Sequence, residues 1–180
     1  MPGRSRTLST SDERRGDVLR EAIRIFAERG FWGANTTEIA HAAGISQAYL
    51  YRLFASKEAL FVAVLEEVKS RIDAAIDRVF RDAAPGEVID ALLAPEGAGL
   101  DGDPDAAMVL LHATAASSIE PIGEAVRECY RRQVDNLGAR GLSDVEIRKY
   151  LAWSQYDNAL RAAKILPSSS DERERRLVRG

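Results

Sequence analysis

The sequence has few cysteines and histidines and no glycine-rich loop, and each shortage removes a class of protein. A single cysteine, Cys129, excludes an intrachain disulfide and a zinc site built from several cysteines. The two histidines, His41 and His112, have no second nitrogen or sulfur ligand at helical spacing, so we expect no bound metal. Neither a phosphate loop nor a nucleophile with an adjacent base occurs, so we expect no cofactor and no enzyme.

Long apolar runs are also missing. No stretch reaches the roughly 18 apolar residues of a membrane-spanning helix. The basic N-terminus, with Arg4 and Arg6, lacks the apolar segment of a secretory signal. One cysteine is compatible with a reducing compartment. We therefore expect a cytoplasmic protein with no membrane partner.

Excess charge of one sign is absent from the chain as a whole, but the charges are unevenly distributed. The net charge is −3. Residues 1–60 carry nine basic and seven acidic side chains, whereas residues 61–180 carry sixteen and twenty-one. The first third is therefore the part that we expect to face a polyanion.

What the sequence does have is a high content of aliphatic residues and alanine, which favours an all-α protein. Apolar positions at spacings of three and four predict a long helix from Lys57 to about Asp82. Shorter helical patterns and a second long one follow it, with a loop at 95–104. They cover 87–93, 106–116, a segment from Pro121, and 144–165.

The stretch from Asn35 to Lys57 predicts two short helices joined by a tight turn. Asn35 can cap the first helix, with Glu38 placed as in a capping box, and Ser46 can cap the second. Gly44 stands where a helix ends in a left-handed residue. This is a helix-turn-helix arrangement, whose second helix can enter the major groove of DNA.

At these residues the sequence resembles the DNA-binding domain of the TetR family of transcriptional regulators. The resemblance covers roughly the first third of the chain, in order and at family spacing. One departure is Ala48-Tyr49, where the family often has Gly-Thr. The matching segments are Phe26–Gly30, Thr36–Ala40, Ala43–Ser46, Leu50–Phe54 and Ser56–Phe61.

The DNA-facing residues are expected at two helix starts and along the outer side of the second helix. Helix N-termini favour phosphate, and glutamine and tyrosine can contact base edges. The alternative for Tyr49 and Tyr51 is packing within the helix-turn-helix. The expected DNA contacts are Thr36, Thr37, Ser46, Gln47, Ala48, Tyr49, Tyr51, Arg52 and Lys57.

A ligand cavity is expected beyond the first domain, because the segment 106–116 is apolar nearly all round. His112 is its one imidazole, either a polar anchor for a small molecule or a core histidine with its own partner. The candidate pocket residues are Met108, His112, Tyr130, Trp153 and Tyr156.

The resemblance implies a three-helix helix-turn-helix domain followed by a helical bundle that binds a ligand and dimerises. We expect a DNA-binding domain at 1–56, with the helix-turn-helix at 35–54, a regulatory domain at 57–166 and a polar tail at 167–180. The resemblance also implies that the last two long helices of each subunit form a four-helix interface of a homodimer. The expected interface stripe on the last long helix is Ile147, Leu151, Ser154, Asn158 and Ala162.

The function implied is a repressor that binds a palindromic double-stranded operator and is released by a small apolar or amphipathic effector. A ligandless or an activating regulator is the alternative within DNA binding. A helical enzyme or a protein-interaction module is a more distant alternative, but the sequence offers no catalytic group for the former.

Overall fold

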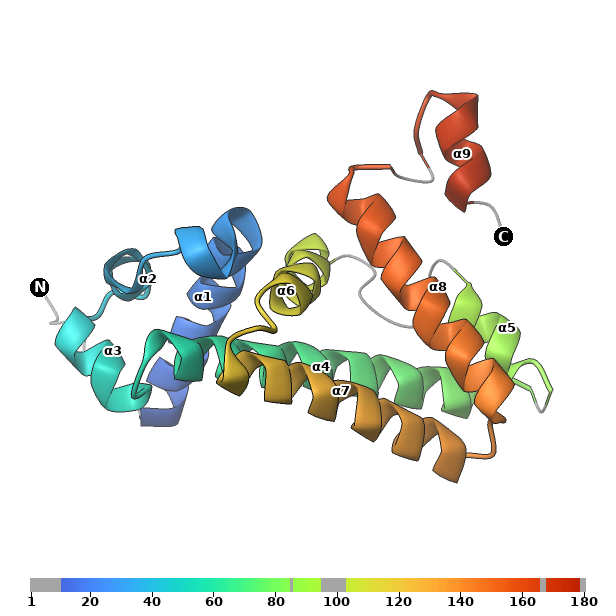
Figure 1. Cartoon of the computed structure of the whole chain (residues 1–180), viewed down its shortest axis with the longest axis horizontal. Coiled ribbons are helices and arrows are strands. Elements are labelled where there is room, and N and C mark those ends of the chain that lie inside the picture. The colour runs from blue at the N-terminus through green and yellow to red at the C-terminus, as the bar shows by residue number, and fades with distance from the viewer. Residues whose placement is uncertain (1–10, 85, 95–102, 166–167, 179–180) are drawn as a thin grey trace, which may run out of the picture.

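The computed structural model describes residues 11–84, 86–94, 103–165 and 168–178, and all regular secondary structure in these ranges is helical (Figure 1). The all-α prediction is therefore confirmed. The helices are α1 (Ser11–Gly33), α2 (Thr36–Ala42), α3 (Gln47–Leu53), α4 (Lys57–Asp82), α5 (Val88–Leu93), α6 (Pro104–Ala115), α7 (Glu120–Ala139), α8 (Asp144–Ala162) and α9 (Glu172–Val178).

Helices α1, α2 and α3 lie together at one end of the molecule, and α4 runs from them along its length (Figure 1). Helix α7 lies beside α4, and α8 packs against α6 and α5. Helix α6 also packs extensively along α1. Two helices of the larger bundle, α4 and α6, therefore touch the end that carries the helix-turn-helix.

The predicted capping residues do cap their helices. Side-chain oxygens of Asn35, Ser46 and Ser56 accept hydrogen bonds from the backbone N–H groups of residues 37, 49 and 59 at 2.8, 3.2 and 3.1 Å. Gly44 has φ +66° in the turn between α2 and α3, as the pattern predicted. Helix α4 begins at Lys57 and ends at Asp82, at the predicted positions.

Gly30 interrupts α1 three residues before its end, with φ 67° and ψ 177°. A glycine in the left-handed region commonly ends a helix, but here the helix resumes after the break and continues to Gly33. The break turns Phe31 into the core, where it is 4% exposed, and leaves Trp32 72% exposed. The position of Trp32 could not be decided from the pattern.

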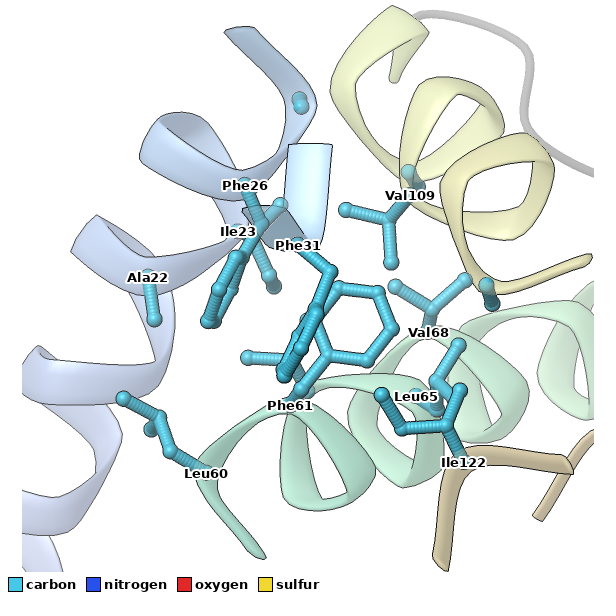
Figure 2. Packing of buried hydrophobic residues seen from close by; sticks show 14 of the residues in the cluster. Ala22, Ile23, Phe26, Phe31, Leu60, Phe61, Leu65, Val68, Val109 and Ile122 are labelled. Atoms are coloured by element: carbon cyan, nitrogen blue, oxygen red, sulfur yellow. The ribbon is translucent and has the colours of Figure 1, made fainter. Parts of the chain in front are cut away.

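The core begins with three aromatic rings from α1 and α4 (Figure 2). Phe61 meets Phe26 and Phe31 edge-on, with ring centroids 4.7 and 5.4 Å apart. Val109 of α6 and Ile122 of α7 join the same buried cluster. Burial of this kind stabilises by about 25 cal/mol per Å² of apolar surface. Because one buried cluster joins α1 to α4, α6 and α7, the helix-turn-helix end and the larger bundle are stabilised together.

The remaining boundaries differ only slightly from expectation. Helix α8 ends at Ala162, and the polar tail includes the short helix α9, in which no residue is buried. The division at residues 56 and 166 into domains stays a prediction, because the buried cluster is continuous across residue 56. The predicted basic arm with Arg4 and Arg6, and residues 95–102 of the predicted loop, lie outside the described residues.

Candidate nucleic-acid interface and ligand cavity

Helix α3 presents a polar N-terminal end at the surface. Leu50 is fully buried and anchors the helix, while Gln47, Ala48 and Arg52 are exposed. Tyr49 is half-buried, and the guanidinium of Arg52 lies 5.6 Å from the centre of its ring. Thus the residues expected to read DNA stand on the outer side of α3, with Tyr49 and Arg52 held together.

Thr36 differs from expectation, because its side chain turns inward and is only 6% exposed. Its hydroxyl lies 3.0 Å from the hydroxyl of Tyr51 and accepts a hydrogen bond from Nε2 of Gln47 at 3.1 Å. Both partners belong to α3. We correct the assignment of the Thr36 side chain from a DNA contact to a positioning group for Gln47 and Tyr51.

Contacts from α1 fix both ends of the helix-turn-helix, and the sequence did not predict them. Arg15 donates from Nη1 to the carbonyl of Leu53 at 3.0 Å, and its guanidinium lies 4.2 Å from the ring centre of Phe54. Arg29 binds Glu38 at 2.7 Å, so Glu38 pairs with α1 and no capping-box bond to Asn35 is found for it. In the sequence, Arg15 and Arg29 are only basic residues of the first helix, and no local pattern indicates that they contact Leu53 and Glu38.

Two further helix starts face outward beside α3. Thr37 is exposed in the first turn of α2, where Asn35 caps the helix. The ammonium of Lys57, at the start of α4, lies 4.8 Å from the ring centre of Phe31. Burial lowers the pKa of Lys57. An ammonium with reduced hydration at a helix N-terminus is suited to a phosphate.

A cavity of about 70 Å³ lies among α4, α5, α6, α7 and α8. Of the candidate pocket residues, Tyr130 and Trp153 line it. Its apolar wall comes mainly from the middle of the helices. Those side chains are Leu65, Ile72, Leu92, Leu110, Ala113, Ala125 and Val126.

The other three predicted pocket residues do not line this cavity. Nε2 of His112 lies 3.2 Å from the carbonyl oxygen of Ala27, so His112 is the core histidine with its own partner. Met108 packs against the buried cluster. Tyr156 lies in a separate, more open pocket of about 750 Å³ and donates to the carbonyl of Leu177 at 3.3 Å. Helical periodicity gave the run of apolar residues but not which side of α6 faces α1.

The polar side of the cavity contains residues that sequence reasoning did not select. The side chain of Lys69 is 4% exposed, and its ammonium donates to Oε1 of Glu66 at 3.0 Å. Burial raises the pKa of Cys129 and of Tyr150 above their usual ranges. Lys69 follows Leu65 by four residues and precedes Ile72 by three. A lysine within an apolar stripe was the signal that could have identified it.

The predicted interface stripe on α8 faces the inside of its own subunit. Ile147 and Asn158 are each 4% exposed, and Leu151 packs against the buried cluster. Ser154 and Asn158 line the cavity. These residues share a helix face, as predicted, but that face covers α6 and the cavity. For Ile147 and Asn158, which are buried in their own subunit, the assignment to a dimer interface is therefore wrong, whereas for Leu151, Ser154 and Ala162, which are half-buried, it stays a prediction.

Two structural findings bear on the excluded functions. Within the described ranges, no helix combines the length and the apolar character that crossing a bilayer requires. The same residues contain no group of three or more histidine, cysteine, aspartate or glutamate side chains placed to hold a metal.

Residues 18–64 match the family model described as bacterial regulatory proteins, tetR family. The activator FasR of Mycolicibacterium smegmatis is 47% identical over 55 residues, which cover 31% of this chain and 25% of FasR. The repressor KstR of Mycobacterium tuberculosis is 28% identical over 156 residues, covering 78% of this chain and 71% of KstR. The chain thus spans about a quarter of the first relative but most of the second.

The fold also matches solved structures beyond the helix-turn-helix. The fatty acid degradation regulator FadR of Bacillus halodurans superposes with a TM-score of 0.66 at 17% identity. That match covers 94% of this chain and 93% of FadR. Since the identity is low, this likeness concerns the fold, and it extends over the cavity-bearing bundle as well as α1 to α3.

Proposed function

We propose that the chain is a DNA-binding transcriptional regulator of the TetR type, controlled by a small molecule, because residues 18–64 match the tetR family model. The observation that supports this most directly is the outer side of α3, where Gln47, Ala48 and Arg52 are exposed around a buried Leu50. A regulator of this kind binds chromosomal DNA, so we propose that the protein is cytoplasmic.

The proposed docking places the N-terminal half of α3 in the major groove. Gln47 and Tyr49 then face base edges, and Gln47 can form a bidentate pair with adenine. Thr37, Ser46, Tyr51, Arg52 and Lys57 are assigned to the sugar-phosphate backbone or to the rim of the groove. Phosphate contacts position the protein, and base contacts specify the sequence.

We assign repression as the sense of regulation. KstR, which aligns with most of this chain, is named a repressor. FasR is named an activator, but its match is confined to 55 residues. The sense of regulation depends on where the operator lies relative to the promoter, so activation is the second candidate.

A homodimer would read a near-palindromic operator, with its two α3 helices roughly 34–36 Å apart. The corrected orientation of α8 leaves its opposite face for the partner. Val145 is 67% exposed and Tyr156 is 39% exposed, and Ala152 and Ala159 are exposed between and beyond them. This face of α8, which also carries Lys149, is the proposed interface.

The cavity is proposed as the effector site, since its walls come from α4 and α6, which both touch the N-terminal helices. A ligand shifts an equilibrium only by its differential affinity for the two states. A coupling of about 1–3 kcal/mol lowers operator affinity by roughly 5–150-fold. A ligand that fits one placement of α4 and α6 better than the other would supply it.

The test is selection of bound sequences from a random DNA pool, followed by gel shifts on the recovered motif. We expect a palindromic motif with two half-sites that competitor DNA does not displace. Arg52→Ala should weaken binding to the motif, whereas Arg81→Ala, at the far end of α4, should leave it unchanged. Failure to enrich any motif at low salt would overturn the proposed function.

A further inference from the structure

We propose that the cavity takes a small organic anion, with a carboxylate held by Lys69 and an apolar body held among the helices. This inference rests on the proposed role of the cavity as the effector site and names the chemical class of the effector.

The first observation is the placement of Lys69. A lysine side chain is rarely buried without a partner, because removing an ammonium from water is costly. The side chain of Lys69 is 4% exposed and lines the cavity. Glu66 binds it at 3.0 Å, but the Glu66 side chain is 48% exposed and does not line the cavity. An ammonium has three donors, so Glu66 leaves donors for a ligand.

The second observation is the charge of the lining. Its charged members are Lys69, Arg161 and Asp157, and Asp157 binds Arg161 at 2.7 Å. The described lining therefore has a net charge of +1. Two carboxylates nearby, Glu66 and Asp73, lie 3.4 and 3.5 Å from Arg132. An entering anion would complete the compensation of Lys69 inside the bundle.

The third observation is the separation of polar and apolar walls. Lys69 acts electrostatically on the thiol of Cys129, which accepts a hydrogen bond from Nε2 of Gln133 at 3.3 Å. Tyr150 is close enough to Cys129 and Asp73 for their charges to act on it. Leu65, Leu92 and the alanines of α6 and α7 form the remaining walls. Such an arrangement suits a ligand with one charged head and a compact apolar body.

The size of the cavity limits that body. A cavity needs about 10–15 Å³ of space for one water molecule, and on the same measure this cavity has about 70 Å³. This is about half of the 150 Å³ cavity that holds benzene, so it has room for a short chain rather than for a ring or a long acyl chain. Acetate, propionate and isobutyrate are therefore suitable probes. Their primary amides have nearly the same shape without the charge.

The experiment measures binding of each acid and its amide to the full chain by thermal shift and titration calorimetry. Charge-assisted hydrogen bonds are about twice as strong as neutral ones, so we expect the best carboxylate to bind roughly tenfold or more tightly than its amide. Lys69→Met keeps the apolar stem and should bring the two affinities within a factor of about two, by the same reasoning. Lys69→Arg should retain the preference for the acid.

Glu66→Gln gives a result that a purely structural role for Lys69 would not give. Because the charge of Glu66 partly compensates that of the ammonium, this variant should bind the carboxylate more tightly than the wild-type protein. It should also melt lower without ligand and recover on its addition. Glu67→Gln is the matched control, since Glu67 pairs with Arg71 outside the cavity, and it should change neither affinity nor recovery.

Three outcomes overturn the inference: equal binding of acids and amides, a preference that survives Lys69→Met, or no shift from any of the carboxylates. If Lys69→Met does not fold, the Glu66→Gln comparison decides alone. DNA selection is independent of these measurements. If an operator is selected but no preference for carboxylates is found, only the proposed effector class is wrong. If carboxylates are preferred but no operator is selected, only the proposed regulator function is wrong.

Discussion

His112 of α6 reaches the backbone of α1, with Nε2 3.2 Å from the carbonyl oxygen of Ala27. The next residue, Ala113, lines the cavity. Neighbouring side chains of α6 thus face the proposed effector site and the support of the DNA-reading helix. This contact joins α6 directly to α1.

The first prediction is that His112→Leu weakens the effect of a ligand on DNA binding. The variant keeps the apolar volume but loses the bond to Ala27, a loss of about 1 kcal/mol in unfolding free energy. Operator affinity without ligand should remain near that of the wild type, while the ligand-induced drop becomes smaller. Fluorescence anisotropy with labelled operator measures both. An unchanged drop would mean that the signal travels through α4.

The second prediction concerns Gly30, which lies close to the ring of His112. A Cβ at Gly30 would lie 3.0 Å from Nδ1 of His112, and the backbone has φ +67° with extended ψ. This is a region that only glycine adopts easily, at a cost of about 1–3 kcal/mol for other residues. Gly30→Ala should lower the unfolding free energy by at least that amount in urea denaturation.

Gly44→Ala is the control for Gly30→Ala. Gly44 has φ +66°, but a Cβ added there would meet no neighbour within 4 Å, so only the left-handed cost of about 1–2 kcal/mol applies. If the clash with His112 matters, the double variant Gly30→Ala/His112→Ala should lose less stability than the sum of the single variants. Strict additivity would remove His112 from the explanation.

The parts of the fold that the sequence predicted are those set by nearby residues. Caps at Asn35, Ser46 and Ser56, the turn at Gly44 and the full length of α4 follow from spacing within a few turns. Apolar periodicity also identified which α8 residues share a face. It could not say whether that face meets a partner subunit or the bundle of its own chain, because both are apolar.

The parts that failed depend on contacts between distant segments. Thr36 read as an exposed helix start, but its hydroxyl serves α3 through Gln47 and Tyr51. His112 stood among apolar residues, which suits both a pocket and a core histidine, and the position of α1 decides between them. For Lys69, the polar wall of the cavity forms when α4, α7 and α8 meet, which no local pattern encodes.

The third prediction concerns alkaline pH. Burial raises the pKa of the Cys129 thiol, so the folded protein retains a proton that the unfolded chain loses near pH 8.5. The stabilisation from this group is complete below about pH 8.5 and is lost as pH rises toward the folded-state pKa. Tyr150, whose pKa is also raised by burial, adds a second loss above about pH 10.

The measurement is urea unfolding at pH 7.5, 8.5 and 9.5 for the wild type and Cys129→Ala. We expect the unfolding free energy of the wild type to fall more steeply between the last two values than that of the variant. Equal slopes in the two proteins would mean that the thiol titrates alike in the folded and unfolded states.

The fourth prediction separates affinity from specificity at the DNA. Lys57→Ala should weaken binding to all sequences similarly and reduce the salt slope by about one, because a phosphate contact reads no base. Gln47→Ala should relax the preference at one position per half-site, at about 1–3 kcal/mol. Thr36→Val, which removes the hydroxyl that holds Gln47, should produce a milder form of the same change.

Selection from a random pool with each variant gives the motif, and titrations at several salt concentrations give the slope. Lys57→Ala requires a check of folding, because it also loses the contact with Phe31. An unchanged motif with Gln47→Ala would show that Gln47 does not read a base, and Tyr49 would then become the main candidate.

The last prediction concerns the dimer and follows from the orientation of α8. Leu151 packs against its own core, so Leu151→Glu should destabilise each subunit and cannot test an interface. Ala152 is exposed on the opposite face, between Val145 and Tyr156. Ala152→Glu should place a charge between subunits, where burying an unpaired carboxylate is unfavourable enough to favour the monomer. Sedimentation should then show monomers with unchanged helix content by circular dichroism. Operator affinity should fall, because one half-site alone cannot hold the protein as tightly as two.

Ala74→Glu makes the same change at an exposed position on α4 and should remain dimeric. An Ala152→Glu protein that sediments as a dimer and binds its operator normally would show that the subunits meet elsewhere.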